Sequence, residues 1–360
     1  MANTTGVRQS KLKRLVFAPQ TTIGTAETLD ASTLAIPVIG TPEMSPSRGT
    51  KRISRADVLD AYAGEAIGVI GSVGWTASWS TEIHDTSGPT YYPYWAQILM
   101  CAGHEGDYDA GTSTVTFKPT TKELVNWAAP TTADSDPACA TIALLHNHND
   151  SGNDAYSVMY DSVGSVGFNF TTGERATMDC SFSGRVEAGG LYNTGSIDIA
   201  STGSFGQIQG APFVCKAMNV TLTDNTSSQV VTTVAINNVV ISSNIEMSDV
   251  NDMTDAHGFA LSPSFQNSGA SVAFEVADGG GATGTERYLM QNLLAGNQMA
   301  MTLGITGSAG RSVEFNAGKI QFDDVGFGET NGYSTFTVNG TCVRTAGTND
   351  DPYTFVWTFA

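Results

Sequence analysis

Two histidines separated by a single residue are the best candidates for metal chemistry in the sequence. His146 and His148 stand in the stretch HNHNDSGNDAY, with Asp150 just behind them. Alternate residues of a strand point to the same side, and imidazole is a good ligand for zinc. A third protein ligand at short spacing is not evident, and the stretch is typical of a polar loop. We therefore predict no metal ion and keep a zinc site as the alternative.

A glycine-rich stretch resembles a nucleotide-binding loop. Gly279, Gly281 and Gly284 in DGGGATGTE satisfy the pattern G-x-G-x-x-G between a strand signal and a helix signal. A dinucleotide fingerprint follows a buried parallel strand and has an acidic residue about 20 positions further on. Here the strand is half polar, and the acidic residue after Glu286 is Glu314. We predict an ordinary loop and no cofactor.

Neighbouring carboxylates offer a third possible chemistry. Asp323–Asp324 and Asp350–Asp351 could be glycosidase acids or calcium ligands, but adjacent acids on a strand or turn more often face water. A Ser-His-Asp arrangement with a G-x-S-x-G elbow is also missing from the sequence. We predict no catalytic residue and no enzyme. A β-sandwich hydrolase, which would need two carboxylates converging in a cleft, is a rival reading.

The composition indicates that these residues are carried by strands. The chain has 360 residues, of which 41% are hydrophobic and 14% charged, with abundant Gly, Ser and Thr. Apolar residues tend to alternate with polar ones, which favours an all-β fold with few, short helices. The five cysteines are scattered, and we predict that they are small buried side chains. No apolar run approaches the roughly 18 residues of a membrane span, so we expect a protein made in the cytoplasm.

Net charge is the most informative feature of the composition. The chain holds 17 basic and 35 acidic residues, a formal charge of −18. Residues 1–55 contain eight of the basic residues and three of the acidic ones, so the other 305 residues carry nine basic and 32 acidic side chains. Affinity for nucleic acid comes from lysine and arginine at the phosphates, so the acidic body predicts a protein that does not grip DNA. The plainer alternative is that the charge serves solubility.

A strand and a short helix follow one another in the first half of the chain. Alternation predicts a strand over residues 71–82, with Trp75 and Trp79 on one face. The helix after it has Pro93 in its first turn and Gly103 at its end, the positions that these residue types prefer. We expect this helix to lie against a sheet.

The same order of elements recurs in the second half. A predicted hairpin, with strands at 163–171 and 176–186, closes the first set. The matching stretches are GASVAFEVAD with GSVGWTASWSTE, ERYLMQNLLAG with YYPYWAQILMCAG, Gly318–Phe322 with Gly164–Phe168, and Ser334–Gly340 with Thr177–Gly184. We predict two similar β-rich domains in tandem.

The domain boundaries follow from this repeat. We predict a basic N-terminal arm with the first strands at 1–55, a first domain at 56–211 and a second domain at 212–360. Within the first domain, residues 104–156 are expected to form a loop insert, and the Gly/Ser/Thr-rich residues 187–211 a connecting segment.

Stretches spread over nearly the whole chain carry a resemblance to a known family. They are RLVFAPQTTIGTAETLDASTLAIPVIG, GWTASWSTE, PYWAQILMCAG, STVTFKPTT, VGSVGFNFTTGERATMDCSFSGRV, NNVVISSNIEMSDVNDM and GFALSPSFQNSGASVAFEV. In pattern and order they resemble the major tail protein, or tail tube protein, of long-tailed bacteriophages. The segment 104–156 is where the correspondence is weak.

The resemblance implies a fold and an assembly. It implies two tandem tail-tube-like β-sandwich domains, each with a short flanking α-helix, whose inner sheets join into a ring-shaped β-barrel on assembly. Stacked rings would form the tube of a long noncontractile tail in the virion, through which double-stranded DNA passes without specific binding. Tape-measure, tail-terminator and tail-tip proteins would be partners. If each half is one module, three chains make a pseudo-sixfold ring, which we favour over six chains.

The resemblance also suggests roles for particular residues. The lumen candidates are Glu174, Asp179, Asp323 and Asp324, whose plainer interpretation is an ordinary solvated face. The candidates for an arm between rings are Arg8, Lys11, Lys13 and Arg14. The main rival to the tube is a non-enzymatic adhesin or glycan-binding fibre domain, because tryptophan and tyrosine faces also stack on sugars.

Overall fold

The protein is built mainly of strands. The computed structural model describes residues 13–29, 34–45, 51–53, 69–72, 74–85, 92–120, 124–127, 135–146, 155–186, 193–194, 210–216, 218–225, 230–231, 236–243, 249–250, 260–261, 270–277, 285–344 and 351–359. Strands make up 66% of the structure, in large antiparallel sheets with two short helices. The predicted β-rich class is confirmed.

The elements fall into two series along the chain. The first comprises β1 (Arg14–Pro19), β2 (Leu34–Ile36), β3 (Val38–Ser45), β4 (Lys51–Ile53), β5 (Val69–Ser72), β6 (Gly74–Glu82), α1 (Tyr94–Cys101), β7 (His104–Asp109), β8 (Thr114–Pro119), β9 (Ala140–His146), β10 (Ala155–Thr171), β11 (Thr177–Val186) and β12 (Asn193–Thr194). The second comprises β13 (Asn219–Asp224), β14 (Val230–Val231), β15 (Ile236–Ser243), β16 (Asp249–Val250), β17 (Ala260–Leu261), β18 (Ala270–Ala277), α2 (Thr285–Ala295), β19 (Gln298–Thr306), β20 (Ser312–Thr330), β21 (Tyr333–Cys342) and β22 (Thr354–Thr358).

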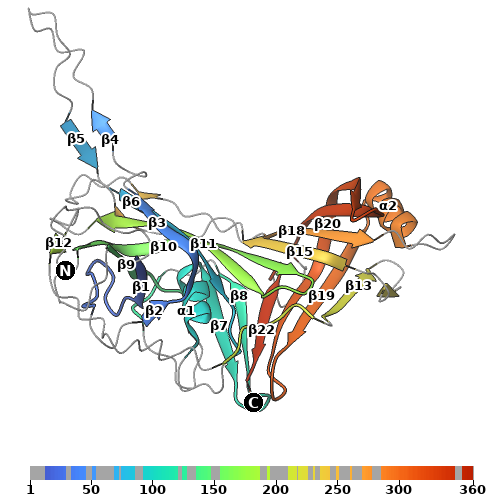
Figure 1. The fold of residues 1–360 in the computed structure, drawn as a ribbon, viewed down its shortest axis with the longest axis horizontal. Coiled ribbons are helices and arrows are strands. Elements are labelled where there is room, and N and C mark those ends of the chain that lie inside the picture. The colour runs from blue at the N-terminus through green and yellow to red at the C-terminus, as the bar shows by residue number, and fades with distance from the viewer. Residues whose placement is uncertain are drawn as a thin grey trace, which may run out of the picture.

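Eight of these strands form one antiparallel sheet, which we call the long sheet. Its order is β3, β6, β11, β10, β15, β18, β21 and β20. Figure 1 shows it running along the upper side of the molecule, from β3 and β6 to β18 and β20. In its middle, Asn169 of β10 lies opposite Val240 of β15. Strands from both halves of the chain therefore share one sheet.

Two unusually long strands, β10 and β20, each take part in a second layer. The first part of β10 pairs with β9, and its last part pairs with β11 and β15. Likewise, the first part of β20 pairs with β19 and β22, and its last part pairs with β21. The register shifts between Tyr160 and Val163 in β10 and between Phe322 and Asp324 in β20. Such bulges bend a strand, which lets it pass from one layer to the other.

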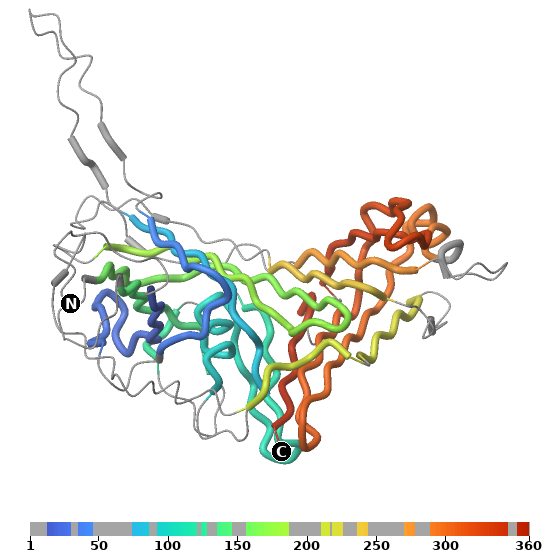
Figure 2. The backbone as a smooth tube through the Cα atoms, in the orientation of Figure 1, coloured from blue at the N-terminus to red at the C-terminus, as the bar shows by residue number. Residues whose placement is uncertain are grey.

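The second layer lies below the long sheet in Figure 1 and Figure 2 and completes the core. It contains the ladder β2, β1, β9 and β10, and the ladder that joins β13, β19, β20, β22, β8 and β7. The C-terminal strand β22 thus pairs with β8 of the first half. The described ladders branch at β10 and β20 without returning on themselves, and this part of the chain forms no closed barrel.

The pairing pattern of the first half recurs in the second. The chain of neighbours β1, β9, β10, β11, β6 and β3 has the counterpart β13, β19, β20, β21, β18 and β15. Each series also has its helix directly after the counterpart strands β6 and β18. The domain division near residue 212 stays a prediction, and the strands on its two sides are joined in one ladder.

Helix α1 is completely enclosed. All eight of its residues are buried, although the sequence suggests only one apolar stripe. The ring of Trp95 packs against those of Phe117 and Trp357, with centroids 6.1 Å and 5.8 Å apart. Gly103 follows the helix with φ of 84°, a conformation in which glycine is at no disadvantage. β8 and β22 thus contact the helix through Phe117 and Trp357, and the one amide side chain of the helix, Gln97, donates to the Tyr92 carbonyl oxygen at 2.8 Å.

The expectation of a loop insert over 104–156 needs correction. This segment contains β7, β8, β9 and the start of β10, and the side chains from Ala140 to Leu145 are buried. The run ATIALLH is apolar on both faces because β9 lies between β1 and β10 inside the second layer. The sequence of β9 therefore lacks the alternation of apolar and polar residues that marks a strand with one exposed face.

The match of Gly318–Phe322 with Gly164–Phe168 also needs correction. Gly184 and Gly340 are counterparts, since an added Cβ at either would come within 3 Å of the backbone of the bulged partner strand. Val163 lies opposite the residue before Gly184, and Asp324 lies opposite the residue before Gly340. Residues 324–330 are therefore the counterpart of residues 163–169. The similar residue types of 318–322 and 164–168 concealed this correspondence in the sequence.

The five cysteines, Cys101, Cys139, Cys180, Cys215 and Cys342, are all free and buried. Burial is also the first cause that raises the pKa of each of these thiols. Their predicted role as small core side chains is confirmed.

Candidate functional site

The most distinctive surface of the protein is one side of the long sheet, which we call the open face. On each strand the residues that point to it alternate with residues that point into the core. On β11, for example, Asp179 and Ser181 are exposed, whereas Cys180 and Phe182 are buried. The open face consists of the paired positions Thr76, Ser78, Ser80, Glu82, Thr177, Asp179, Ser181, Ser183, Ser165, Gly167, Asn169, Thr171, Asn238, Val240, Ser242, Ser271, Ala273, Glu275, Thr337, Asn339, Thr341, Gln321, Asp324 and Gly326, with Glu43 and Ser45 at the β3 edge.

The chemistry of the open face is that of small neutral side chains with scattered carboxylates. Its acidic residues are Glu43, Glu82, Asp179, Glu275 and Asp324, and Asp323 in the β20 bulge adjoins them through its hydrogen bond with Thr341. Among the paired positions just named there is no lysine or arginine. In the eight strands of the long sheet and the described β10–β11 turn, the basic residues are Arg175 in the turn, Lys319 early in β20, and Arg185, which is buried beside Asp161. The face therefore offers an anion no cluster of positive charge.

Asp179 is held at the centre of three adjacent strands. Its carboxylate accepts hydrogen bonds from Ser80 Oγ of β6 and from Asn169 Nδ2 of β10, the latter at 2.5 Å. Two neutral donors satisfy the carboxylate without neutralising it. The negative charge is thereby fixed in position on the open face.

Glu275 is similarly held on β18. Thr330 Oγ1 of β20 donates to one of its oxygens, and Asn237 Nδ2 donates to the other at 3.2 Å. These hydrogen bonds, with that from Thr330 first, lower the pKa of the Glu275 carboxyl below its ordinary value. Glu275 therefore keeps its negative charge at neutral pH.

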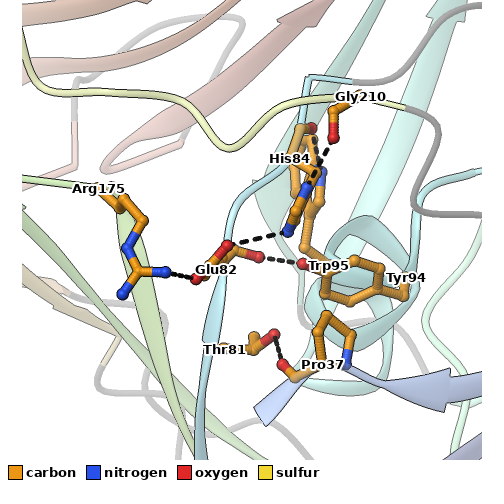
Figure 3. Close-up of polar contacts among 8 residues, drawn as sticks. All are labelled: Pro37, Thr81, Glu82, His84, Tyr94, Trp95, Arg175 and Gly210. Atoms are coloured by element: carbon orange, nitrogen blue, oxygen red, sulfur yellow. Dashed lines mark hydrogen bonds and ion pairs between the residues drawn. The ribbon is translucent and has the colours of Figure 1, made fainter. Parts of the chain in front are cut away.

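Glu82 joins the end of β6 to its surroundings, as Figure 3 shows. One carboxylate oxygen forms an ion pair with Arg175, and the other lies 3.2 Å from His84 Nε2. The opposite ring nitrogen of His84 lies 3.0 Å from the carbonyl oxygen of Gly210. Tyr94 of α1 donates its hydroxyl to the Glu82 carbonyl oxygen. This cluster connects β6, the β10–β11 turn, α1 and the segment 210–216.

The four predicted lumen residues are placed differently from one another. Asp179 and Asp324 lie on the open face and are exposed. Asp323 lies at the β20 bulge, where Thr341 Oγ1 donates to it at 2.8 Å. Glu174 lies in the β10–β11 turn, beyond the end of the face. Three of the four therefore share one surface, and their role in a lumen stays a prediction.

Two of the four predicted arm residues, Lys13 and Arg14, are described and lie at β1, in the second layer. Arg14 begins β1, opposite Leu145 of β9, and Lys13 directly precedes it. Arg8 and Lys11 lie outside the described residues. The histidine stretch of the zinc alternative lies largely outside them too, since His146 ends β9 and residues 147–150 are not described. Within the described part of the chain, no group of three His, Cys, Asp or Glu side chains could hold a metal ion.

Several residues of the open face went unrecognised in the sequence. Ser80, Asn169 and Glu275 make its hydrogen bonds, yet each is a common surface residue type. The signal that could have found them is the period of two in neighbouring strands, once the strand order is known. That order is a property of pairing between distant segments.

No protein-family model matches the chain, and no curated protein is significantly similar to it. Neither helix in the described residues has the length and apolar character needed to cross a membrane.

Proposed function

We propose that this protein is a tail tube subunit of a long-tailed bacteriophage. In this proposal, copies of the chain form rings, the rings stack into the tube of a long noncontractile tail, and the open face lines the channel through which double-stranded DNA leaves the virion. The protein has a structural role and performs no reaction. The observation that carries the proposal is the long sheet, whose open face is wide, polar and free of lysine and arginine at its paired positions.

The repeated strand pairing supports a ring with pseudo-sixfold symmetry. Each half of the chain contributes four strands to the long sheet, in corresponding order. Each half therefore acts as one tail-tube module, a β-sandwich with a flanking helix, and the division near residue 212 separates the modules. Three chains then supply six modules to a ring. A ring of six chains would be needed if only one half lined the channel.

The ends of the long sheet support assembly rather than a free monomer. No described strand pairs with the outer side of β3 or with the outer side of β20 beyond Phe322. Unpaired edges of this kind invite pairing with another chain, and a closed ring removes them. Joining the long sheets of neighbouring copies would produce a barrel that the single chain does not form.

Electrostatics explain how such a channel would work. DNA is retained where lysine and arginine displace counterions from its phosphates. The open face instead presents fixed carboxylates such as Asp179 and Glu275 among hydroxyl and amide groups. At physiological ionic strength a charge acts over about 8 Å, so the wall repels DNA at short range and holds it nowhere. The genome then slides without sticking.

The remaining partners follow from the same role. A tube of this kind needs a tape-measure protein that sets its length, a terminator that ends it and a tip complex that begins it. Lys13 and Arg14, with the basic residues before them in the sequence, would contact the acidic surface of the next ring. The protein would be made in the host cytoplasm and would end up in the virion tail.

The glycan-binding alternative gains little from the described residues. Its basis is the aromatic content, since exposed rings stack on sugars. Trp75, Trp79, Trp95 and Trp357 are all buried, at most 5% exposed, and pack in the core. Phe327 and Tyr333 are the large aromatic side chains that the described surface exposes, and they lie at a sheet edge, where a neighbouring chain could cover them.

Assembly in solution tests the proposal. The purified protein is concentrated stepwise and followed by light scattering after size exclusion, with negative-stain electron microscopy of the large fractions. We expect hollow rings or tubes. Monomers at every concentration, including in mixtures with tape-measure and tail-tip proteins, would reject the tube, and a glycan-array signal from those monomers would favour the adhesin.

A further inference from the structure

The chain contains within itself a joint between the two unlike edges of its repeated sheet. β15 is the counterpart of β3, and the last part of β10 is the counterpart of the last part of β20. Within one chain β15 and β10 are paired, with Val240 opposite Asn169 and Ser242 opposite Gly167. Their counterparts, β3 and the last part of β20, are the two ends of the long sheet, and among the described strands none pairs with their outer sides.

We infer that the C-terminal end of β3 of one copy, at Ser45, meets the last part of β20 of a neighbouring copy, in the register that already joins β15 to β10. This inference rests on the proposed function, because it names the surfaces by which the ring closes. The partner is a second copy of this chain, and the joint between copies repeats the joint inside each copy.

The register follows from residue correspondences. Ser45 lies opposite Thr76 of β6, which lies opposite Ser183 of β11. Val240 lies opposite Ala273 of β18, which lies opposite Asn339 of β21. Because Ser183 and Asn339 both precede the glycine at the bulge, Ser45 and Val240 are counterparts. Val163 lies opposite Ser183, and Asp324 lies opposite Asn339. Asn169 and Thr330 each lie six residues further on, so they are counterparts too. The pair Val240 and Asn169 therefore predicts Ser45 of one copy opposite Thr330 of the next.

The outer edge of β20, with which no described strand pairs beyond Phe322, has hydrogen-bonding groups in the required places. Asn331 and Gly332 both have positive φ, 53° and 79°, as in a two-residue type I′ turn. In such a hairpin the flanking pair, Thr330 and Tyr333, exchanges both hydrogen bonds. The backbone groups of an antiparallel strand alternate in direction, so those of Glu329 and Phe327 point away from β21 to the free edge.

Apolar exposure marks the same edge. The side chain of Phe327 is 76% exposed, whereas that of its counterpart Val166 on β10 is 2% exposed. Tyr333, at the turn, is 72% exposed. At the corresponding place in the first half, β15 runs alongside β10, and the matching edge is covered. A neighbour placed in the same way would cover Phe327.

Disulfide trapping tests the inference. Thr330 directs its backbone groups to β21, so a strand on its other side meets it as a non-hydrogen-bonded pair, with Cα atoms about 4.5 Å apart. That separation suits a disulfide. We therefore expect the double variant Ser45→Cys/Thr330→Cys, oxidised with copper phenanthroline in assembled particles, to give covalent dimers and trimers on a denaturing gel, ending at the trimer. The native cysteines are all buried, which keeps the background low.

The chain provides a matched control. Asn169→Cys/Val240→Cys introduces the corresponding pair inside one chain and should oxidise without forming any covalent oligomer. Each single variant, Ser45→Cys or Thr330→Cys, should stay monomeric on the gel. A covalent dimer from either single variant would instead mean that like edges meet, and it would overturn the inference.

The outcomes separate the edge pairing from the tube itself. If hollow particles form and the internal pair oxidises, but Ser45→Cys/Thr330→Cys gives no covalent oligomer, the edge pairing is wrong and the tube proposal stands. If the wild type forms no particles and the pair gives no oligomer, the edge pairing and the tube proposal are both wrong.

A second variant, Glu329→Pro, removes one outward N–H and leaves the β20–β21 hydrogen bonds intact, so it should fold but not form rings. Glu329→Thr, which keeps the N–H, should assemble, and unimpaired assembly of Glu329→Pro would also contradict the edge pairing.

Discussion

Asp85 and Ser308, far apart in the sequence, are joined by two hydrogen bonds that connect the two halves of the chain. The backbone nitrogen and Oγ of Ser308 both donate to Asp85 Oδ2, at 2.7 Å and 2.5 Å. Arg311 Nη1 lies 3.4 Å from the other carboxylate oxygen. Asp85 is 2% exposed, so these donors replace the water that its charge would otherwise have.

Replacing Asp85 should therefore destabilise the whole chain. We expect Asp85→Asn to lower the free energy of unfolding by about 2–4 kcal/mol, because it removes the charge that offsets Arg311 and sets an amide donor against the donors of Ser308. Urea unfolding at a concentration below assembly measures the loss. Asp324→Asn, on an exposed residue, is the control and should change stability by less than about 0.5 kcal/mol. Equal losses in the two variants would show that the buried contact contributes nothing of its own.

Two glycines of β10 should respond oppositely to the same substitution. A Cβ on Gly164 would stand 2.1 Å from the carbonyl oxygen of Ser181 and 2.7 Å from the ring of Phe182. A Cβ on Gly167 would have its nearest contact at 3.7 Å, from Ser242 Oγ. Gly164→Ala should cost about 2 kcal/mol or more through displacement of β11, and Gly167→Ala should be neutral or slightly stabilising. Thermal unfolding of the two variants side by side checks this, and similar melting temperatures would contradict the close approach of β10 and β11.

His104 should make the fold sensitive to acid. Its Nδ1–H donates to the Leu99 carbonyl oxygen at 3.1 Å, and its Nε2 accepts from the Tyr353 hydroxyl at 3.0 Å. Burial lowers the pKa of His104 to about 4. The unfolded chain, with a histidine pKa of about 6.5, then binds a proton between pH 6.5 and 4 that the folded chain does not. Stability therefore falls as the pH drops through this window, by up to about 1.4 kcal/mol per pH unit and about 3 kcal/mol in total.

The variant His104→Gln isolates this effect. It should be less stable than the wild type at pH 7, yet lose less further stability between pH 6.5 and pH 4. Urea unfolding at four or five pH values gives both slopes. If the slopes are the same, His104 takes no part in the acid sensitivity, and the buried carboxylates must account for all of it.

Lysine on the open face should make a channel wall adhesive. Ser181→Lys with Asp324→Lys replaces an exposed hydroxyl and an exposed carboxylate of this face by ammonium groups. Assembled particles of the double variant should co-sediment with short duplex DNA, and the binding should weaken with salt with a logarithmic slope of about −2 per copy. The wild type should not bind. Thr306→Lys with Asp136→Lys makes the same change of charge away from the open face and is the control; binding by both double variants would remove the special role of this face.

The sequence predicted those elements whose two faces differ. β6, β11 and β18 each have one face in the core and one on the open side, so their buried residues recur with a period of two. Trp75 and Trp79 of β6 and Phe182 of β11 belong to this buried set. Pro93 and Gly103 likewise mark the two ends of α1. All these signals depend on residues that are close together in the chain, so they can be recognised in a single sequence.

Elements buried on both sides, and contacts between distant segments, could not be predicted. β9 is a continuous apolar run with no alternation, and its neighbours β1 and β10 decide that it is a strand. Asp85 and Arg311 are ordinary surface types until the fold brings them together. Asp179 and Asp324 of the open face were singled out in the sequence as lumen candidates, but the extent of the face depends on the pairing of β10 with β15. The spacing of residues along the chain does not predict that pairing.

Whether the open face of the long sheet lines a channel is best tested by a cryo-electron microscopy map of the assembled particle. We predict a hollow ring of three copies with six similar lobes, in which Asp179, Glu275 and Asp324 face the lumen and α1 lies outside the channel wall. A channel lined by the second layer, or a particle with no channel along its axis, would contradict it.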